Sequence, residues 1–459
     1  MMQRLFARHA LLPQGWSEDV VVEIDDGGSI ASVMPGGDPS DTERVTGPLL
    51  PAMPNVHSHA FQRGLAGRTG RHSHDRSDTF WTWRDVVYDF LDQLDADDLE
   101  AVTTQAYVEM VKAGYTTVAE FHYVHHDVDG RPLADPAENA WRVVNAARVA
   151  GIGLTLLPVF YAHAGFGGTD PTRRQRRLVH APHTFERLFE ALVNARDRHG
   201  YVLGIAPHSL RAVTPEELAR VLALAPPGAP VHIHVAEQTR EVDDCYAWSR
   251  MRPVEWLLAE ASIDERWCLV HATHMTEREV KELAASRAVA GLAPTTEADL
   301  GDGTFPAEAY LVNGGRFGVG SDSNTVIDPF IELRQLEWSQ RLRLRRRNVL
   351  ASDGDTTVGN ALWQAALRGG AQAVGWRVGE IAPGMRADLL VLNTNDPALV
   401  EQPAECVLDG AIFGPARQPV RDVMCGGRWV VREGGHPQEA EVARRYRSVL
   451  SKMRAIGGS

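Results

Sequence analysis

Residues 49–63, which read LLPAMPNVHSHAFQR, place two histidines, His57 and His59, at the end of a short apolar run with two prolines. In an extended strand, alternate side chains point to the same face, so both imidazoles can reach one ion from a single strand end. A helix would separate them by roughly 200° around its axis. An isolated His-x-His pair is usually two unrelated polar residues, but candidate partners follow later in this chain. We therefore interpret the pair as half of a metal site.

Strands and helices alternate from about residue 50 to residue 370. The strand-like stretches after the opening one cover residues 116–121, 153–160, 203–206, 231–235, 268–271, 289–292 and 317–320, with helix-like stretches between them. This alternation implies a parallel sheet, and eight such units imply a closed α/β barrel of the (β/α)8 TIM type. A doubly wound sheet would require a glycine-rich phosphate turn after an early strand, and the sequence has none.

The two ends of the chain are expected to form a second, smaller domain. Residues 4–33 alternate in strand fashion around a glycine-rich turn, and residues 387–392 and 420–431 are also strand-like. Two β-rich ends on either side of one barrel predict that they pair with each other. The expected domains are a small β-sandwich of residues 1–50 with 372–433, a barrel of residues 51–371, and a polar C-terminal helix of residues 434–459.

Composition excludes several classes of function. The formal net charge of −13 over 459 residues predicts no broad cationic surface for nucleic acid or an anionic membrane. The four cysteines are widely spread and form no Cys-x-x-Cys pair, which argues against a disulfide framework or a structural zinc knuckle. No apolar run approaches the roughly 18 residues of a membrane span, and no signal-peptide pattern opens the chain. We therefore expect a cytoplasmic protein that binds neither nucleic acid nor membrane.

Further polar residues follow the later strands of the predicted barrel. The fifth strand ends in His234, with Glu237 three residues on, the sixth ends in His271, and Asp322 follows the eighth. Active sites of this barrel class lie at the C-terminal ends of the strands, so these side chains are expected to meet His57. Three histidines and an aspartate suit one divalent ion, most simply Zn²⁺, although Fe²⁺ tolerates the same ligands.

The order and spacing of these residues resemble the amidohydrolase superfamily over nearly the whole chain, including residues 379–389. Members with two metal ions usually carry a bridging lysine at the fourth strand. The three lysines of this chain lie elsewhere (Lys112, Lys281 and Lys452). The resemblance therefore implies a single metal ion, as in the deaminase branch, held by His57, His59, His234 and Asp322.

Within that branch, four segments resemble the N-formimidoyl-L-glutamate deiminases of histidine degradation. They are residues 57–63 (HSHAFQR), 80–84 (FWTWR), 119–123 (AEFHY) and 207–211 (PHSLR). The resemblance implies hydrolysis of N-formimidoyl-L-glutamate to N-formyl-L-glutamate and ammonia. The superfamily resemblance also suggests a homodimer.

That reaction needs a nucleophile, a proton shuttle and recognition of two carboxylates. A bound divalent ion would lower the pKa of its water to roughly 7. Asp322 would then accept a proton from the water, and Glu237 would transfer protons to the departing nitrogen. His271 would hold the attacking water or steady the tetrahedral intermediate.

The carboxylates of the substrate call for planar cationic side chains, which arginine provides and lysine does not. Arg84 and Arg211 are the candidates, with Gln62, Tyr123 and His208 as hydrogen-bonding partners. The simpler alternatives are a helix-surface arginine for Arg84 and a loop salt bridge for Arg211, with Gln62 and Tyr123 as supports for the other groups.

Two other functions are compatible with parts of this pattern. A deaminase of guanine, adenosine-type or triazine substrates would use the same metal ligands, but a neutral aromatic substrate would not need two arginines. A barrel that has lost catalysis and serves as a scaffold would typically have lost metal ligands, and none is missing here.

Overall fold

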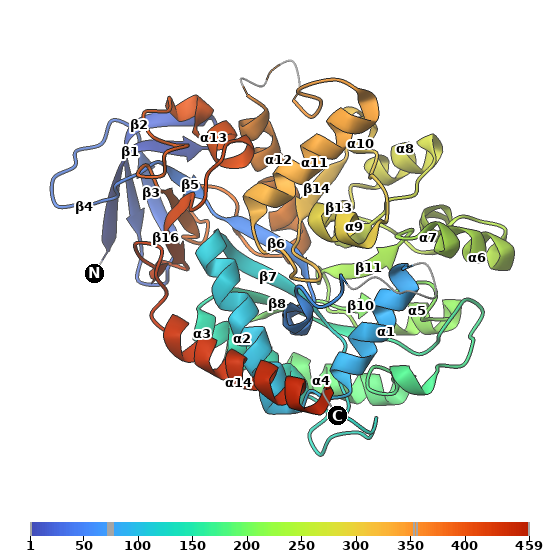
Figure 1. Cartoon of the computed structure of the whole chain (residues 1–459). Coiled ribbons are helices and arrows are strands. Elements are labelled where there is room, and N and C mark those ends of the chain that lie inside the picture. The colour runs from blue at the N-terminus through green and yellow to red at the C-terminus, as the bar shows by residue number, and fades with distance from the viewer. Residues whose placement is uncertain (1, 71–77, 352–353, 355–356, 458–459) are drawn as a thin grey trace.

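The computed structural model describes residues 2–70, 78–351, 354 and 357–457. A ring of parallel strands surrounded by helices forms the larger part, and a β-sheet containing the N-terminus lies beside it (Figure 1). The last helix, α14 (Glu439–Gly457), packs along α2 (Ala96–Ala113) on the outside of the barrel. No helix in the described ranges is long and apolar enough to cross a membrane.

The parallel strands form a closed barrel. Their bounds are β6 (Met53–Ser58), β7 (Tyr115–His122), β8 (Gly153–Phe160), β9 (Val202–Leu203), β10 (Ala206–Pro207), β11 (Val231–Val235), β12 (Trp267–His271), β13 (Val289–Leu292) and β14 (Arg316–Val319). β6 to β10 pair in one sheet and β11 to β14 in another. Parallel bridges from Ile205 to Val231 and from Ser58 to Asp322 join the two sheets at both edges. The predicted barrel is confirmed.

The fourth strand of the barrel differs from its prediction because it is split into β9 and β10. Gly204 lies at the break, where an added Cβ would lie 2.5 Å from Leu157 and 2.7 Å from the carbonyl of Pro230. The Gly204 N–H still bonds to Leu156 of β8, whereas the N–H of Ile205 already bonds to Pro230. Pairing with β8 is interrupted between Leu203 and Ala206, so the strand appears as two short pieces.

Helices follow the barrel strands and cover the ring. Their bounds are α1 (Phe80–Leu91), α3 (Glu138–Ala150), α4 (Pro182–His199), α5 (Pro215–Leu222), α6 (Thr239–Ser249), α7 (Pro253–Glu260), α8 (Glu277–Ser286), α9 (Pro294–Leu300), α10 (Ala307–Val312), α11 (Pro329–Leu344), α12 (Val358–Val374) and α13 (Val407–Phe413). Several begin at a residue whose side chain accepts an N–H of the first turn, such as Thr214 before α5 and Thr276 before α8. These caps fix where the loops at the carboxyl ends of the strands stop.

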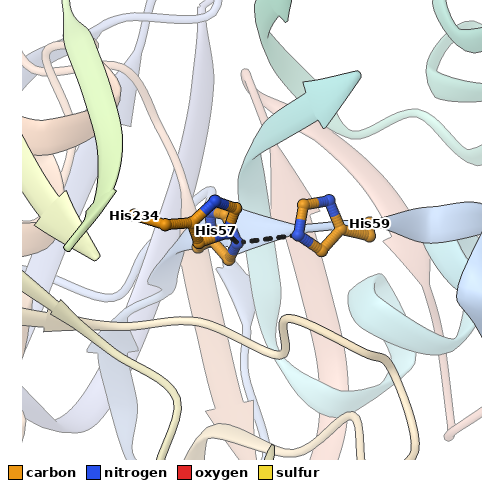
Figure 2. A group of neighbouring side chains, drawn as sticks. All are labelled: His57, His59 and His234. Carbon is orange, nitrogen blue, oxygen red and sulfur yellow. Dashed lines mark hydrogen bonds between the residues drawn. The ribbon is translucent and has the colours of Figure 1, made fainter. Parts of the chain in front are cut away.

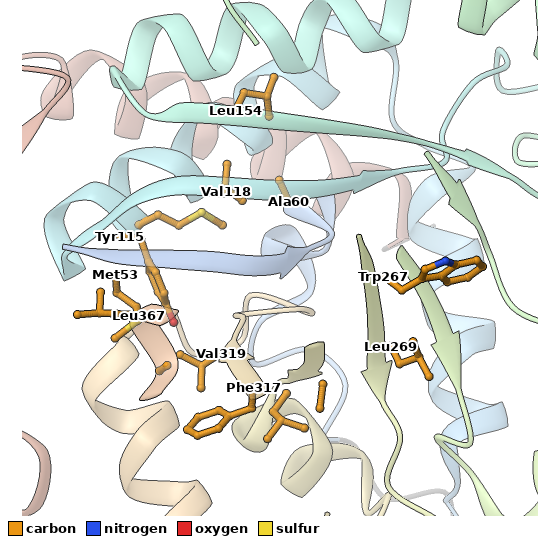
Figure 3. Packing of buried hydrophobic residues seen from close by; sticks show 14 of the residues in the cluster. Met53, Ala60, Tyr115, Val118, Leu154, Trp267, Leu269, Phe317, Val319 and Leu367 are labelled. Atoms are coloured by element: carbon orange, nitrogen blue, oxygen red, sulfur yellow. The ribbon is translucent and has the colours of Figure 1, made fainter. Parts of the chain in front are cut away.

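Apolar side chains of the barrel strands pack against those of the surrounding helices in one large buried cluster. Phe317 and Val319 of β14, Leu269 of β12 and Val118 of β7 are all within 1% of complete burial and belong to one cluster (Figure 3). Burying a side chain of this size contributes about 1.5–3 kcal/mol. This packed interior gives the strand ends a rigid base on which polar side chains can be held in fixed positions.

The two chain ends meet in one small domain, as predicted. Its strands are β1 (Gln3–Leu12), β2 (Gly15–Ile24), β3 (Ile30–Met34), β4 (Glu43–Arg44), β5 (Leu49–Pro51), β15 (Leu389–Leu392), β16 (Val420–Cys425) and β17 (Arg428–Val431). β5 pairs with both β1 and β15, which joins the two ends of the chain. The sheet folds back on itself, because Ser29 bridges to Arg386 and Gly28 contacts the backbone of Gly426.

Candidate metal centre and its pocket

Three histidine rings from two strands meet at the carboxyl end of the barrel (Figure 2). His57 lies in β6, His59 follows the same strand, and His234 lies in β11. Nε2 of His57 is 3.2 Å from Nε2 of His59 and 3.1 Å from Nε2 of His234. All three residues are buried, and together they could hold a metal ion.

The protonation of these rings favours a cation between them. Nδ1 of His59 lies 3.1 Å from the carbonyl oxygen of Phe121, and Nδ1 of His234 lies 3.1 Å from that of His208. A carbonyl oxygen only accepts, so each Nδ1 carries the proton and each Nε2 presents a lone pair. Burial lowers the pKa of His59 to about 3, which keeps that ring neutral. The Nε2 lone pairs of His59 and His234 both face Nε2 of His57, an arrangement that a positive ion between the three rings would stabilise.

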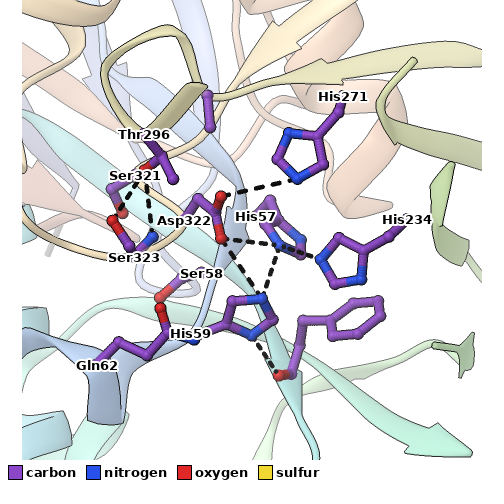
Figure 4. Close-up of polar contacts among 12 residues, drawn as sticks. His57, Ser58, His59, Gln62, His234, His271, Thr296, Ser321, Asp322 and Ser323 are labelled. Atoms are coloured by element: carbon purple, nitrogen blue, oxygen red, sulfur yellow. Dashed lines mark hydrogen bonds and ion pairs between the residues drawn. The ribbon is translucent and has the colours of Figure 1, made fainter. Parts of the chain in front are cut away.

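Asp322 completes the set of ligand atoms (Figure 4). Its Oδ1 lies 3.4 Å from Nε2 of both His57 and His59. Ligand atoms 2.0–2.2 Å from a tetrahedral ion lie about 3.3–3.6 Å apart, so these separations fit zinc-like coordination. Burial alone would raise the pKa of Asp322, but His57 and His59 outweigh it and hold the carboxyl below its usual range. The donor set therefore fits one divalent ion.

The backbone at these strand ends adopts conformations that residues other than glycine rarely occupy. The φ angles are +50° at Ala236, +69° at His271 and +42° at Asp322. Each such residue costs on the order of 1–3 kcal/mol, and such residues cluster at functional sites. At Asp322, reciprocal backbone hydrogen bonds with His57 (3.0 Å) and His59 (2.9 Å) hold the strained turn in place.

Two acid–base groups, His271 and Glu237, lie beside the carboxylate of Asp322, with His271 between the other two. Nε2 of His271 is 3.8 Å from Asp322 Oδ2 and 3.7 Å from Glu237 Oε1, and its Nδ1 is 3.4 Å from Glu297. Burial would lower the pKa of His271, but the charges of Glu237, Glu297 and Asp322 raise it well above its ordinary value. Burial raises the pKa of Glu237 to about 7. This row of groups can hold and pass protons near neutral pH.

Every site residue predicted from the sequence, except His57, lines one pocket above the histidines. His57 itself is fully buried beside them. The pocket extends from His59, His234 and Asp322 to the two arginines, Arg84 and Arg211. The structure therefore brings together predicted residues from seven separate segments of the chain.

The arginine end of the pocket is built around one indole ring. The guanidinium carbon of Arg84 lies 4.5 Å from the centre of the Trp81 ring, that of Arg240 lies 4.9 Å away and that of Arg211 lies 5.7 Å away. Arg211 is almost completely buried, and its Nε lies 3.9 Å from Oε2 of Glu241. Guanidinium groups stacked on an aromatic face keep their N–H edges free for an anion.

Neutral hydrogen-bonding groups lie between the two ends of the pocket. Gln62 donates to the hydroxyl of Tyr123 at 3.0 Å. Nδ1 of His208 lies 2.9 Å from the hydroxyl of Ser209. Burial and then the charge of Arg211 lower the pKa of His208 well below its ordinary value, so this ring is neutral.

Sequence reasoning missed several residues of the site. Tyr88 and Tyr161 line the pocket beside the arginines, and Gln175 donates to the Tyr161 hydroxyl at 2.6 Å. Tyr88 lies four residues after Arg84 on α1, so the helical period alone could have placed it on the same face. Nothing local marks Tyr161, which arrives from the end of β8.

Comparison with known proteins gives consistent results. Residues 49–430 match the family model described as the amidohydrolase family, and residues 2–46 match the one described as formimidoylglutamate deiminase HutF, N-terminal domain. A formimidoylglutamate deiminase of Pseudomonas aeruginosa is 50% identical over 452 residues, covering 98% of this chain and 100% of that protein.

Solved structures give the same picture. A crystal structure of an amidohydrolase from Brucella melitensis has a TM-score of 0.93 at 47% identity, covering 98% of this chain and 99% of that one. A zinc-bound adenosine deaminase from Xanthomonas campestris has a TM-score of 0.80 at 22% identity, covering 99% and 98% of the two chains. The second likeness concerns the fold alone.

Proposed function

The chain belongs to the amidohydrolase family, and we propose that it hydrolyses N-formimidoyl-L-glutamate to N-formyl-L-glutamate and ammonia in histidine degradation. It is a hydrolase that acts on a carbon–nitrogen bond. One observation carries the substrate: a single pocket joins the His–Asp centre to Arg84 and Arg211. An amidine at one end and carboxylates at the other match that distribution of charge.

The alternative, a nucleobase deaminase, fits less well. A neutral aromatic base would offer no negative charge to the two arginines, Arg84 and Arg211, that line the pocket. Identity to the formimidoylglutamate deiminase is 50%, against 22% to the adenosine deaminase. The sequence and the pocket therefore favour the dicarboxylate.

The superfamily uses a divalent metal ion, and we take Zn²⁺ as the ion here, held by His57, His59, His234 and Asp322. A divalent ion lowers the pKa of a water molecule bound to it to roughly 7 and so supplies a nucleophile at neutral pH. The hydrogen bonds from Nδ1 of His59 and His234 to backbone carbonyls orient both rings toward that ion.

The remaining steps belong to the side chains of the pocket. Asp322 accepts a proton as water adds to the amidine carbon, and His271, beside Oδ2 of Asp322, holds the attacking water or steadies the tetrahedral intermediate. Glu237 delivers a proton to the terminal nitrogen. The bond from the amidine carbon to that nitrogen then breaks while the carboxylate of Glu237 takes the proton of the added hydroxyl, which releases ammonia and leaves the formyl group on the glutamate nitrogen. Acid–base groups placed in this way contribute about 10²–10⁴-fold in rate.

The arginines bind and orient the substrate. Arg211 is positioned for a bidentate contact with one carboxylate, and Arg84, held against Trp81, faces the same end of the pocket. Tyr123 and His208 offer neutral hydrogen bonds between the two ends. These contacts would place the amidine carbon beside His59 and Asp322.

Ammonia release from N-formimidoyl-L-glutamate by zinc-loaded protein tests this function, with guanine and adenosine as controls. We expect turnover of formimidoylglutamate and none of the bases. Turnover of guanine or adenosine alone would contradict the proposed substrate but would not contradict the proposed metal centre.

The metal ligands make a separate prediction. We expect about one ion per chain in the wild type and far less in His234→Ala, measured by elemental analysis after dialysis. Ion at 100 times its dissociation constant should stabilise the wild type by about 2.7 kcal/mol in thermal unfolding. His163→Asn is the matched control, since His163 pairs with Glu217 instead. A full complement of ion in His234→Ala would exclude His234 as a ligand.

We also propose that the protein is a cytoplasmic homodimer. Its four cysteines are free thiols, in keeping with a reducing compartment. Trp338 and Leu342, four residues apart on α11, are 42% and 81% exposed and offer an apolar face to a second copy. The mass in solution, measured by light scattering, tests the dimer.

A further inference from the structure

Glu241 lies in the first turn of α6 and holds the turn that carries Glu237. Its side chain is only 1% exposed. Oε1 accepts the N–H of Ala236 and Oε2 accepts the N–H of Glu237, each at 3.2 Å. Ala236 is the residue with a φ of +50°, so these two bonds stabilise a backbone conformation that alanine otherwise avoids. The direction in which Glu237 leaves the strand therefore depends on Glu241.

The same carboxylate faces Arg211. Oε2 of Glu241 lies 3.9 Å from Nε of Arg211, and this nitrogen has no hydrogen-bond partner in the described part of the chain. Burial alone would lower the pKa of Arg211, but the charges of Glu241 and Glu237 raise it. Glu241 is therefore the nearest counter-charge for a guanidinium that is buried in the pocket wall.

We infer that Glu241 is a positioning residue that couples carboxylate recognition by Arg211 to proton transfer by Glu237, an inference that rests on the proposed function. The buried carboxylate of Glu241 accepts hydrogen bonds from the backbone of Ala236 and Glu237, and it also faces the side chain of Arg211. When a substrate carboxylate engages Arg211, the guanidinium is shared between two anions, and Glu241 anchors it relative to Glu237. Recognition and chemistry are thus held in one fixed geometry.

Glu279 provides a comparison within the same chain. It is fully buried in the first turn of α8 and accepts the N–H groups of Thr276 (2.7 Å) and Glu255 (3.2 Å). It also bonds to Nε of Arg252 at 2.8 Å. The chemistry of its contacts matches that of Glu241, but none of these residues lines the pocket. Glu279→Gln therefore has the same structural cost without the proposed coupling.

The kinetics of Glu241→Gln and Glu279→Gln separate the proposed coupling from a purely structural role. A glutamine accepts one of the two N–H bonds and carries no charge toward Arg211. A displacement of about 1 Å can cost about 10²-fold, so we expect kcat/KM for formimidoylglutamate to fall by about 10² in Glu241→Gln. Both parameters should contribute to this fall: KM should rise because Arg211 binds the carboxylate less well, and kcat should fall because Glu237 is misplaced. Glu279→Gln should keep wild-type kinetics and lose only thermal stability.

Two further measurements distinguish coupling from general damage. The double variant Glu241→Gln with Arg211→Met should lose less than the product of the single losses, because the residues act together. With formamidine, which has no carboxylate, Glu241→Gln should still lower kcat through Glu237, but the fall in kcat/KM should be smaller than with formimidoylglutamate. Fully multiplicative losses, or a Glu241→Gln protein that behaves like Glu279→Gln, would overturn the inference.

A crystal structure of Glu241→Gln gives a readout independent of any substrate. We expect the turn at residues 235–237 to relax and the guanidinium of Arg211 to move. An unchanged turn and guanidinium would refute the positioning role even if the enzyme is active. A wild type that fails to hydrolyse formimidoylglutamate would refute the proposed function, while the crystal structure still decides the role of Glu241.

Discussion

Arg211→Met should lower kcat/KM for N-formimidoyl-L-glutamate by about 10²–10³-fold in protein that retains its metal ion. Removing one partner of a buried, hydrogen-bonded charge pair costs about 2–5 kcal/mol. Methionine keeps the apolar length of the side chain, so the pocket wall beside Tyr161 stays filled. The contact exists in both the bound substrate and the transition state, so most of the loss should appear in KM. Steady-state ammonia release measures both parameters.

Arg240→Met is the matched control for this variant. Arg240 stacks on the same indole ring as Arg211, at 4.9 Å, but its side chain is 67% exposed and pairs with Asp244. Exposed ion pairs contribute little, so its kinetics should stay close to the wild type. Formamidine provides a second control because it offers no carboxylate to either arginine. An equal loss with formamidine in Arg211→Met would show that Arg211 supports the pocket rather than the substrate.

The sequence was sufficient to predict that His57, His59, His234 and Asp322 lie together, because their spacing follows the geometry of strands. His57 and His59 lie two residues apart at the end of β6, and their Nε2 atoms are 3.2 Å apart. Each later candidate also ends a predicted strand, and parallel strands in a barrel bring their carboxyl ends together. A closed ring was enough to bring His234 to His57, although 177 positions separate them.

Other features of the site depend on tertiary contacts that no local pattern records. Ala236 and Asp322 have positive φ angles because surrounding hydrogen bonds impose them, and neither residue type signals this in the sequence. Arg211 and Arg240 reach the Trp81 ring from distant segments of the chain, whereas Arg84 lies three residues after Trp81 on α1. In the sequence, Glu241 looks like an ordinary acidic residue in the first turn of a helix, where acidic side chains are common because they interact favourably with the helix dipole. Its contacts with the turn and with Arg211 appear only in three dimensions.

Glu237→Gln should lower kcat by about 10²–10⁴-fold with little change in KM, because the amide cannot donate a transferable proton to the leaving nitrogen. The side chain keeps its size, and Glu241 still accepts the backbone N–H of residue 237. Asp388→Asn is a suitable comparison, because Asp388 is also a buried carboxyl but bonds to Arg386 and the backbone of Gly426 and does not line the pocket. Single-turnover ammonia release separates this chemical step from binding and product release.

The pH dependence provides an independent test of the same role. Burial raises the pKa of Glu237 to about 7, with Asp322 and Glu241 acting in the same direction and His271 and Arg211 opposing them. A proton donor is active only in its protonated form, so activity should be full below this pKa and fall as pH rises through about 7. The residual activity of Glu237→Gln should lack that fall. If the variant kept the alkaline loss of the wild type, another group would be the proton donor, and His271, 3.7 Å from Glu237, would be the first to examine.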